Sequence, residues 1–568
     1  MKRFIPAVCC IIAAAVPVFA QTGAPAAKQS LASLIQSGDR KASLARIRAG
    51  ADVNEAQPDG TRPVHWAVYH VDYELLGALI AKKAKVSVTN EFGATPIAEA
   101  ASLGDARMVK MLLDAGAEPE GANQDGETAL MLGIKTGELP VVEMLIKAGA
   151  KVNTVEKFHN QTPLMWASGA PKDAAEIVKV LLSKGADVKP RALYSDWPSQ
   201  ITSEPRAQYR PVGGLTALLY AARDGCYECV DELIGASADV NVPTPEGVTA
   251  LMIAIDNDHN DVAKLLLDRG ANPGVWDWWG RTALYIAVDR KEAALTPGRG
   301  GRGGGRGGRG GAAPVVRASS GPRVSSTEII NALVAAGVDV DVELNMHRPS
   351  RGGNSGRFVE EFFNTGCTPL MRAAIANDVQ VAKLLLDKGA DPNVVAMGLT
   401  PFLVASGVGT GRGGGTGLAA STTAGGAGNT ALMDLLLRHG ANINAKVTGT
   451  KTYTMRISRA PSSNEGMTAL HVASQTGRLE VVKFLLDKGA DPDVLDANGK
   501  KPIDLVGTPR GPGRDGQPVA AAAATSASGA PPAAGARNGA PGGRGARPGN
   551  AANAAEVKAL LQDAETKK

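Results

Sequence analysis

The chain has 568 residues, of which 61 are Lys or Arg and 56 are Asp or Glu, so its formal net charge is +5. It contains only five cysteines, which is too few, and an odd number, for a secreted disulfide scaffold. Beyond residue 20, no stretch approaches the ~18 uninterrupted apolar residues of a membrane-spanning helix, which argues against a polytopic membrane protein.

The chain opens with a three-part pattern that is typical of an export signal. The first three residues, MKR, are followed by an apolar run from Phe4 to Val18 and by small residues that end at Ala20. This order predicts a signal peptide over residues 1–20, followed by a linker over residues 21–29. We therefore expect a bacterial protein that is periplasmic or secreted. The alternatives are an uncleaved anchor or a buried N-terminal helix.

A Thr-Pro-Leu or Thr-Ala-Leu step, or a close variant of it, recurs along the rest of the chain at a nearly constant interval. The steps begin at Arg62, Thr95, Thr128, Thr162, Thr216, Thr249, Thr282, Thr368, Thr400, Thr468 and Lys501. Seven of the ten intervals are 32–34 residues long, and the other three are 54, 86 and 68 residues long. A fixed period in this range is the signature of a solenoid of stacked repeats.

Each period predicts two short helices and a projecting loop. In Thr249–Gly270, apolar residues recur at helical spacing in two runs, which Asp258-His259-Asn260 separates. A Gly follows the second run in most periods, and Gly suits the left-handed conformation that ends a helix. The next stretch, such as ANQDGETA, carries a Gly in a tight turn and is expected to project as a hairpin finger.

A second signature follows most steps by about 22 residues, with examples such as LLDKGADPN, LLDRGANPG and LLRHGANIN. Together the two signatures resemble the ankyrin repeat, whose pattern includes Thr-Pro-Leu-His-x-Ala. The best match lies over Gly466–Asp493, and Leu31–Asn54 indicates a further unit without the step. The resemblance implies an all-α ankyrin-repeat solenoid of about twelve units. It also implies binding through the fingers and the inner helices rather than catalysis.

The segments that break the period define the expected organisation. Repeats are predicted over residues 30–290 and 326–506, with a final repeat helix and tail over residues 551–568. Insertions are predicted over residues 190–213, 291–325, 345–365, 407–428, 447–464 and 507–550. Those rich in Gly, Arg and Ala cannot bury enough apolar area to fold alone and are expected to be disordered. Three of the insertions, after Asp289, Ser406 and Val506, fall between the two helices of one repeat. Each of the three long intervals is expected to hold one repeat that is interrupted rather than missing.

The Arg-Gly-rich insertion holds six Arg and no acidic residue over Thr296–Val324. Arg-Gly segments can bind single-stranded nucleic acids through charge and stacking. No aromatic residue is interleaved here, and an exported protein seldom meets RNA, so nucleic-acid binding is not expected. A solvated linker, or weak contact with a polyanion such as envelope polysaccharide or acidic lipid, fits this segment better.

No group of residues predicts catalysis, a metal site or a cofactor. No two His have metal-ligand spacing on one helix, and the Gly-rich runs lack the ending of a phosphate loop. His65 and His471 occupy the His position of the step, where the ring has a structural role. Cys226-x-x-Cys229 lies at the start of a second helix, where redox dithiols occur. We favour structural cysteines or an incidental disulfide, because Cys229 takes a slot that buried aliphatic residues fill elsewhere.

Aromatic residues in the fingers are the first candidate contacts. Only 23 aromatic residues occur in the chain, yet Trp276, Trp278 and Trp279 crowd into one finger, and Phe92 and Phe158 lie at similar positions of others. Trp is the leading hot-spot residue of protein interfaces. The alternative is that the three Trp pack on one another or on the insertion over residues 190–213.

Polar residues at the ends of the first helices are the second set of candidate contacts, because they vary among repeats. This set comprises Tyr69, His70, Arg223, Asp224, Asp289 and Arg290. The sequence thus predicts a non-enzymatic, exported scaffold that binds a protein partner through its fingers and concave surface. The alternative function is association with the envelope or another polyanion through the Arg-Gly-rich segments.

Overall fold

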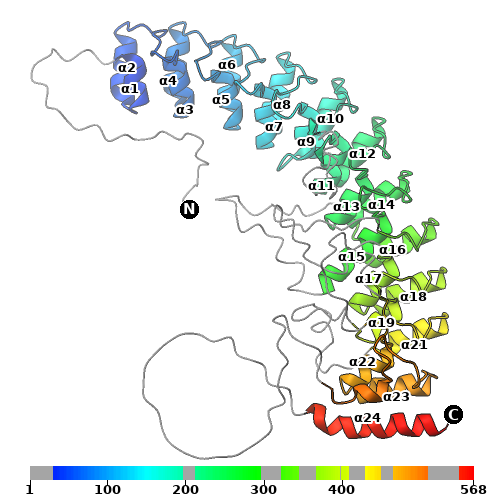
Figure 1. The fold of residues 1–568 in the computed structure, drawn as a ribbon. Helices are drawn as coiled ribbons and strands as arrows, with labels where there is room; N and C mark the ends of the chain where they lie inside the picture. The colour runs from blue at the N-terminus through cyan, green and yellow to red at the C-terminus, as the bar shows by residue number, and fades with distance from the viewer. Residues whose placement is uncertain are drawn as a thin grey trace, which may run out of the picture. The chain divides into compact units, whose positions relative to one another are not determined.

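The computed structural model describes residues 30–195, 212–295, 321–344, 366–396, 398–408, 429–448, 465–508 and 549–567. The predicted signal peptide, its linker and most of each insertion lie outside these residues. The described residues form paired short helices, joined by tight turns and separated by extended fingers (Figure 1). This arrangement confirms the predicted all-α solenoid.

The chain divides into two compact units, residues 1–151 and 152–568, and each unit is a stack of repeats. The first unit holds α1 (Leu31–Gln36), α2 (Arg40–Arg48), α3 (Pro63–Tyr69), α4 (Tyr73–Ala81), α5 (Pro96–Ser102), α6 (Ala106–Asp114), α7 (Ala129–Thr136) and α8 (Leu139–Lys147). The second unit begins with α9 (Pro163–Ser168), α10 (Ala174–Ser183), α11 (Ala217–Asp224), α12 (Tyr227–Gly235), α13 (Ala250–Asp256), α14 (Asn260–Asp268), α15 (Ala283–Leu295) and α16 (Ser326–Ala335). It continues with α17 (Pro369–Ala376), α18 (Val379–Asp387), α19 (Pro401–Ala405), α21 (Thr430–Arg438), α22 (Ala469–Gln475), α23 (Leu479–Asp487), the 3₁₀ helix η4 (Pro502–Leu505) and α24 (Gly549–Thr566).

In most repeats a recurring Thr precedes the first helix and caps it. The hydroxyl of Thr128 accepts the backbone N–H of Met131, and that of Thr249 accepts the N–H of Met252, both at 3.3 Å. This bond satisfies one of the N–H groups that have no partner inside the helix. Where Pro follows the Thr, as Pro96 does in α5, its missing N–H costs nothing at the first helical position.

The second helix of each repeat supplies side chains that only its neighbours can cover. Leu112 and Leu145 in the first unit, and Leu181, Leu266 and Leu485 in the second, are fully buried. First helices pack on first helices and second helices on second helices, as α11 does on α13 and α12 on α14. Two short helices cannot enclose these side chains alone, so each repeat depends on the next for its core.

A ladder of Asn side chains joins successive repeats at the base of the fingers. The side chain of Asn241 accepts the backbone N–H of Asn272 at 2.7 Å and donates to the carbonyl of Gly270 at 3.3 Å. Asn153 and Asn393 make the same two bonds to their own following repeats. These bonds satisfy backbone groups at and just beyond the end of a second helix, where partners within the helix run out.

The predicted structural role of the His position agrees with the structure. Nε2 of His65 lies 3.2 Å from the carbonyl oxygen of Ala94, at the end of the next finger, and His471 makes the equivalent contact. Burial lowers the pKa of both imidazoles below the usual value for His. Tyr285 fills this position in another repeat, with its hydroxyl 3.7 Å from Sγ of buried Cys367.

The three interrupted repeats keep their helix pairs. α15 contacts α16 across residues 296–320, α19 contacts α21 across residues 409–428, and η4 contacts α24 across residues 509–548. The first and second helices of one repeat therefore pack together on either side of each insertion. α15 runs to Leu295, past the predicted end of the repeats at residue 290.

The segment predicted as an insertion over residues 190–213 has structure at both ends. β1 (Tyr194–Ser195) pairs antiparallel with β2 (Val212–Gly213), with Tyr194 opposite Gly213. This short ribbon extends one finger, and residues 196–211 lie outside the described part. The sequence did not predict the ribbon, because each strand has only two residues and shows no alternating pattern.

Asp341 replaces Asn in the ladder, and its carboxylate cannot donate to the following repeat. Both of its oxygens accept the backbone N–H of Asp391, at 3.1 and 3.0 Å. Burial, and then the negative charge of Asp391, raise the pKa of Asp341 above the usual value for Asp. A carboxylate whose folded-state pKa is raised stabilises the fold below its unfolded pKa, and this stability is lost as pH rises through the folded pKa.

We therefore expect Asp341→Asn to stabilise the protein at neutral pH, by about 1 kcal/mol, because it restores a donor and removes a charge. The gain should shrink as the pH falls through the raised folded-state pKa of Asp341, and it should be smallest below the unfolded pKa of about 4. Chemical denaturation at pH 7 and at pH 3.5 measures both effects. The reciprocal exchange Asn241→Asp is the control and should destabilise by a similar amount; an unchanged or lowered midpoint for Asp341→Asn would contradict this account.

Candidate partner-binding surface

Four consecutive fingers of the second unit are bonded to one another, and we call them the finger row. They comprise residues 152–161, residues 186–195 with 212–215, residues 239–248 and residues 272–281. The backbone N–H of Leu193 donates to the carbonyl of His159 at 2.6 Å, which joins the first finger to the second. The guanidinium of Arg191 donates to the carbonyl of Pro243 at 2.8 Å, which joins the second to the third.

The third and fourth fingers approach most closely. The N–H of Trp278 donates to the carbonyl of Glu246 at 2.8 Å. Gly247 next to it has a φ of 83°, and a Cβ there would lie 3.1 Å from the carbonyl oxygen of Trp276. Only Gly fits this approach without strain, so the backbone of the fourth finger is held against its neighbour.

A buried ion pair shapes the Trp finger. The carboxylate of Asp277 accepts the N–H groups of Trp279 and Arg281 at 3.0 and 2.9 Å, and Nε of Arg281 at 2.7 Å. Trp276 is 62% exposed and Trp278 is 45% exposed, whereas Trp279 is only 6% exposed. The guanidinium of Arg281 lies 5.1 Å from the centre of the Trp279 ring. The prediction of Trp279 as a contact residue was therefore wrong, because Arg281 and the stack cover its ring.

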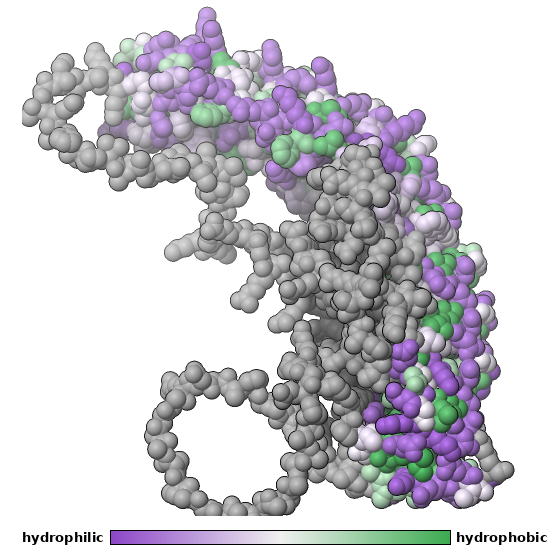
Figure 2. All heavy atoms as spheres, viewed as in Figure 1, coloured by the Kyte–Doolittle hydropathy of each residue, from purple (hydrophilic) through white to green (hydrophobic). Residues whose placement is uncertain are grey.

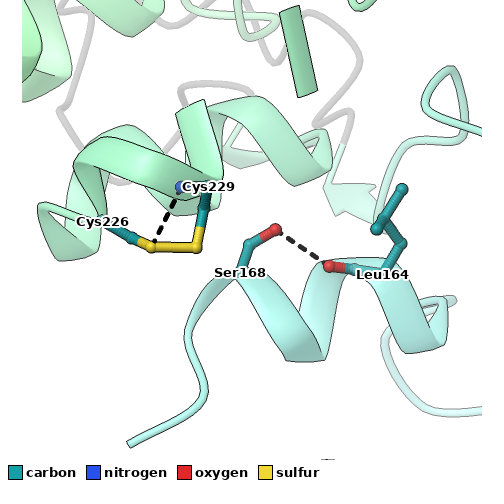
Figure 3. Close-up of a disulfide and its surroundings, with 4 residues drawn as sticks. All are labelled: Leu164, Ser168, Cys226 and Cys229. Carbon is teal, nitrogen blue, oxygen red and sulfur yellow. Dashed lines mark hydrogen bonds between the residues drawn. A yellow bond between two sulfur atoms is a disulfide. The ribbon is translucent and has the colours of Figure 1, made fainter. Parts of the chain in front are cut away.

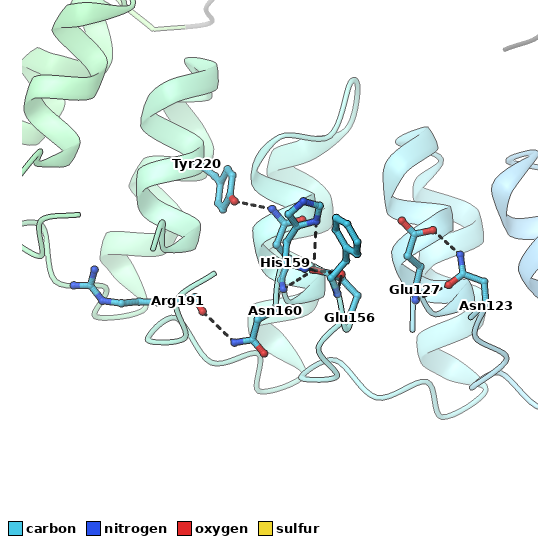
Figure 4. Close-up of polar contacts among 9 residues, drawn as sticks. Asn123, Glu127, Glu156, His159, Asn160, Arg191 and Tyr220 are labelled. Atoms are coloured by element: carbon cyan, nitrogen blue, oxygen red, sulfur yellow. Dashed lines mark hydrogen bonds and ion pairs between the residues drawn. The ribbon is translucent and has the colours of Figure 1, made fainter. Parts of the chain in front are cut away.

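A second buried carboxylate shapes the Phe158 finger. Glu156 is buried and accepts the N–H groups of Phe158 at 2.6 Å, His159 at 2.7 Å and Gln161 at 2.9 Å. Figure 4 shows His159 beside Glu156, and the amide of Asn160 directed at the carbonyl of Arg191, in the next finger. Phe158 itself projects with 69% of its surface exposed.

Two exposed residues of the second finger were missed by sequence reasoning. Leu193 precedes β1 and Tyr194 is its first residue. Both are exposed, but their segment had been assigned to an insertion. Their proximity to the Phe158 finger follows from the bond between Leu193 and His159. We call the exposed apolar residues of the finger row the rim. The rim comprises Val155, Phe158, Leu193, Tyr194, Trp276 and Trp278. On the face seen in Figure 2, apolar residues of the described parts form separate patches among hydrophilic ones.

The candidates in the first unit form their own exposed features. Tyr69 is exposed at the end of α3, with its ring 5.7 Å from that of Trp66 and 5.3 Å from that of His70, both edge-on. Phe92 is exposed in the finger that precedes α5. These residues belong to a different compact unit from the rim, so we treat them separately.

The polar candidates of the second unit are paired within the protein. Asp289 is buried, and its carboxylate accepts Nε of Arg372 at 2.7 Å, so its prediction as a contact residue was wrong. The two residues are far apart in sequence but meet because α15 packs on α17. Nε of Arg290 donates to the carboxylate of Asp258, in the preceding repeat, at 3.0 Å.

Arg223 and Asp224 pair with each other at 2.8 Å, and the guanidinium of Arg223 also lies 4.8 Å from the centre of the Tyr220 ring. This pair remains partly exposed, with 46% and 29% of the two side chains accessible. It is therefore the polar candidate of this unit that keeps surface available for a partner.

The second helices carry ion pairs within one turn of the same helix. Lys110 pairs with Asp114 at 2.7 Å and Lys264 with Asp268 at 2.5 Å. Such exposed pairs contribute little to stability, and they balance charge locally. These ion pairs therefore do not mark the second helices as a contact site.

The described residues offer no group of three or more His, Cys, Asp and Glu side chains that could hold a metal ion. None of the helices in the described ranges is both long enough and apolar enough to cross a membrane.

Comparison with known families agrees with this geometry. The profile for ankyrin repeats in three copies matches residues 32–121, 64–156, 118–192, 218–296 and 397–496, and the single ankyrin repeat profile matches residues 365–396. These matches cover more than half of the chain, so the chain belongs to the ankyrin-repeat family. Ankyrin repeats generally mediate binding between proteins, through the extended surfaces of their stacks.

Individual relatives share only part of their length with this chain. Mitochondrial disaggregase of Homo sapiens is 33% identical over 190 residues, which is 33% of this chain and 24% of the relative. An ankyrin repeat-containing protein of the bacterium Treponema pallidum is 37% identical over 90 residues, or 16% of this chain and 30% of the relative. Alpha-latrocrustotoxin-Lt1a of Latrodectus tredecimguttatus is 26% identical over 140 residues, or 25% of this chain and 8% of the relative.

The three Trp of one finger are expected to respond differently to truncation. Trp279→Ala removes a buried ring and should destabilise the protein by roughly 3–5 kcal/mol. Trp276→Ala and Trp278→Ala remove exposed rings and should change stability by no more than about 0.5 kcal/mol each. Denaturation of the three single variants measures this. Equal losses for all three would mean that the exposed Trp are in fact packed.

Proposed function

We propose that this chain is a non-enzymatic scaffold that binds a protein partner through the rim of its finger row. The rim combines large apolar side chains with a backbone that internal bonds already hold in place. Aromatic side chains dominate the energy of protein interfaces. A surface that is ordered before binding loses less conformational entropy when the partner docks.

The observation that carries this proposal is the contrast between Trp276 and Trp278 on one hand and Trp279 on the other. The finger buries one ring and leaves two exposed, although all three lie within four residues. Leaving a large apolar side chain fully exposed is unfavourable by roughly 1.5–3 kcal/mol relative to full burial, and Trp276 and Trp278, at 62% and 45% exposed, leave part of this free energy unrealised. A partner that covers these rings would recover that free energy.

We further propose that the partner is met outside the cytoplasm of a bacterium, because residues 1–20 have the order of a signal peptide. The competing proposal, association with a polyanion through the Arg-Gly-rich segment, makes a different prediction. Binding by charge alone would weaken steeply with salt and would be lost on deletion of residues 296–320. Binding through the rim would survive that deletion.

The test is quantitative capture of envelope proteins on the immobilised chain, with the partner identified by mass spectrometry and its affinity then measured directly. The double variant Trp276→Ala/Trp278→Ala should weaken that affinity by about 2 kcal/mol or more, near thirtyfold, as expected for hot-spot residues. The matched control is Leu103→Ala, which removes an exposed apolar side chain of the first unit that lies outside the rim. Equal affinity for the double variant and the native chain would refute the proposal.

A further inference from the structure

The first turn of α12 carries a disulfide between Cys226 and Cys229. Figure 3 shows the two sulfur atoms at the start of the helix, and the hydroxyl of Ser168 in α9 directed at the carbonyl of Leu164. The hydroxyl of Ser168 is already bonded to the carbonyl of Leu164 at 2.9 Å. This disulfide lies apart from the rim, and the proposed function does not use it.

The disulfide does not link two different elements of the fold. Cys226 is the N-cap of α12 and Cys229 is the third residue of the same helix. Disulfides stabilise proteins mainly by restricting the unfolded chain, and the effect grows with the length of the loop that is closed. A bridge across three residues of one helix closes a minimal loop, so the stack does not depend on it to stay folded.

Cys226 occupies a position that an oxygen acceptor fills in sister repeats. Asp72, Asp105 and Asn429 each cap a second helix by accepting the N–H of the residue three positions on. In α12 the acceptor is Sγ of Cys226, which lies 3.3 Å from the N of Cys229. If the disulfide were opened, the sulfur of Cys226 would remain at the helix N-terminus, where N–H groups favour an anion.

Cys229 occupies a core position. The equivalent residues Met108, Val262 and Val381 are buried aliphatic side chains, and a reduced Cys is a small residue that suits such a site. Cys229 has no exposed surface, whereas Cys226 keeps 6%. Both residues are buried, but Cys226 is the less buried of the two, so we take its sulfur as the one that an incoming thiol attacks.

From these contacts we propose that Cys226 and Cys229 form an exchangeable dithiol–disulfide couple, whose substrates are thiols of small dithiols or of proteins. The capping and core positions of the two residues suit the reduced pair as well as the oxidised pair. The fold can therefore hold both redox states.

The exchange balances with a dithiol as the reductant. One thiolate of the reductant attacks Sγ of Cys226, which forms a mixed disulfide and releases Cys229 as a thiolate that takes up a proton. The second thiol of the reductant then attacks the reductant sulfur that is bonded to Cys226. This attack closes the disulfide of the reductant and releases Cys226 as a thiolate, which takes up a proton. Two electrons and two protons pass to the cysteine pair, and the reductant leaves as a disulfide.

The test is a redox titration of the folded full-length chain in graded mixtures of reduced and oxidised dithiothreitol, with thiols trapped by a maleimide and located by mass spectrometry. We expect Cys226 and Cys229 to interconvert while the helical circular dichroism signal is unchanged. Cys367 is the internal control, because it is fully buried and its burial raises its pKa to about 12. Cys226 of the reduced protein should label roughly tenfold faster than Cys367, or more.

Two variants separate exchange from a structural role. Cys229→Ser should form a mixed disulfide with an added aromatic disulfide, whereas Cys226→Ser should not. Cys226→Asp/Cys229→Val supplies the cap and core residues of the sister repeats and should fold with a native melting temperature. The proposal is overturned if thiols appear only when the helical signal is lost, if Cys229→Ser is inert, or if the double variant fails to fold.

Discussion

Every level of this structure follows from the fact that one repeat cannot bury its own apolar faces. Leu181, Leu266 and Leu485 are fully buried only because the neighbouring repeats cover them. Stacking therefore fixes the distance between neighbouring repeats, and polar groups form hydrogen bonds across that distance. The Asn ladder and the His contacts both run from one repeat to its neighbour. Repetition of a weakly stable unit thus gives a regular scaffold with the same contacts at each step.

The same regularity explains why the fingers can serve as a binding surface. A loop on an ordinary globular protein is anchored at its two ends, whereas each finger of the finger row is also bonded to the next one through Leu193, Arg191 or Trp278. Buried Asp277 and Glu156 then close the individual loops from inside. The exposed rings are carried by backbone that is already ordered, which is the condition for tight binding by a small number of contacts.

The sequence predicts the fold well, because the period records interactions that recur in each repeat. The two helices of the interrupted repeats follow from it, as does the structural role of His65. Individual exposures were harder to predict. Trp279 and Asp289 are buried by Arg281 and Arg372, which depart from the repeat pattern and, in the second case, lie far away in sequence. Leu193 and Tyr194 were missed because the period is broken there, so the end of their finger was assigned to the insertion over residues 190–213.

The central claim is that bonds between neighbouring fingers order the finger row, in addition to the bonds that close each finger. Native-state hydrogen exchange, followed by mass spectrometry on peptides that contain Leu193 and Trp278, tests it most directly, because both residues donate their amide to the neighbouring finger. The account predicts that these amides are protected nearly as strongly as those of α14 and open together with the adjacent repeats. Exchange at the rate of a free loop, while α14 stays protected, would contradict it.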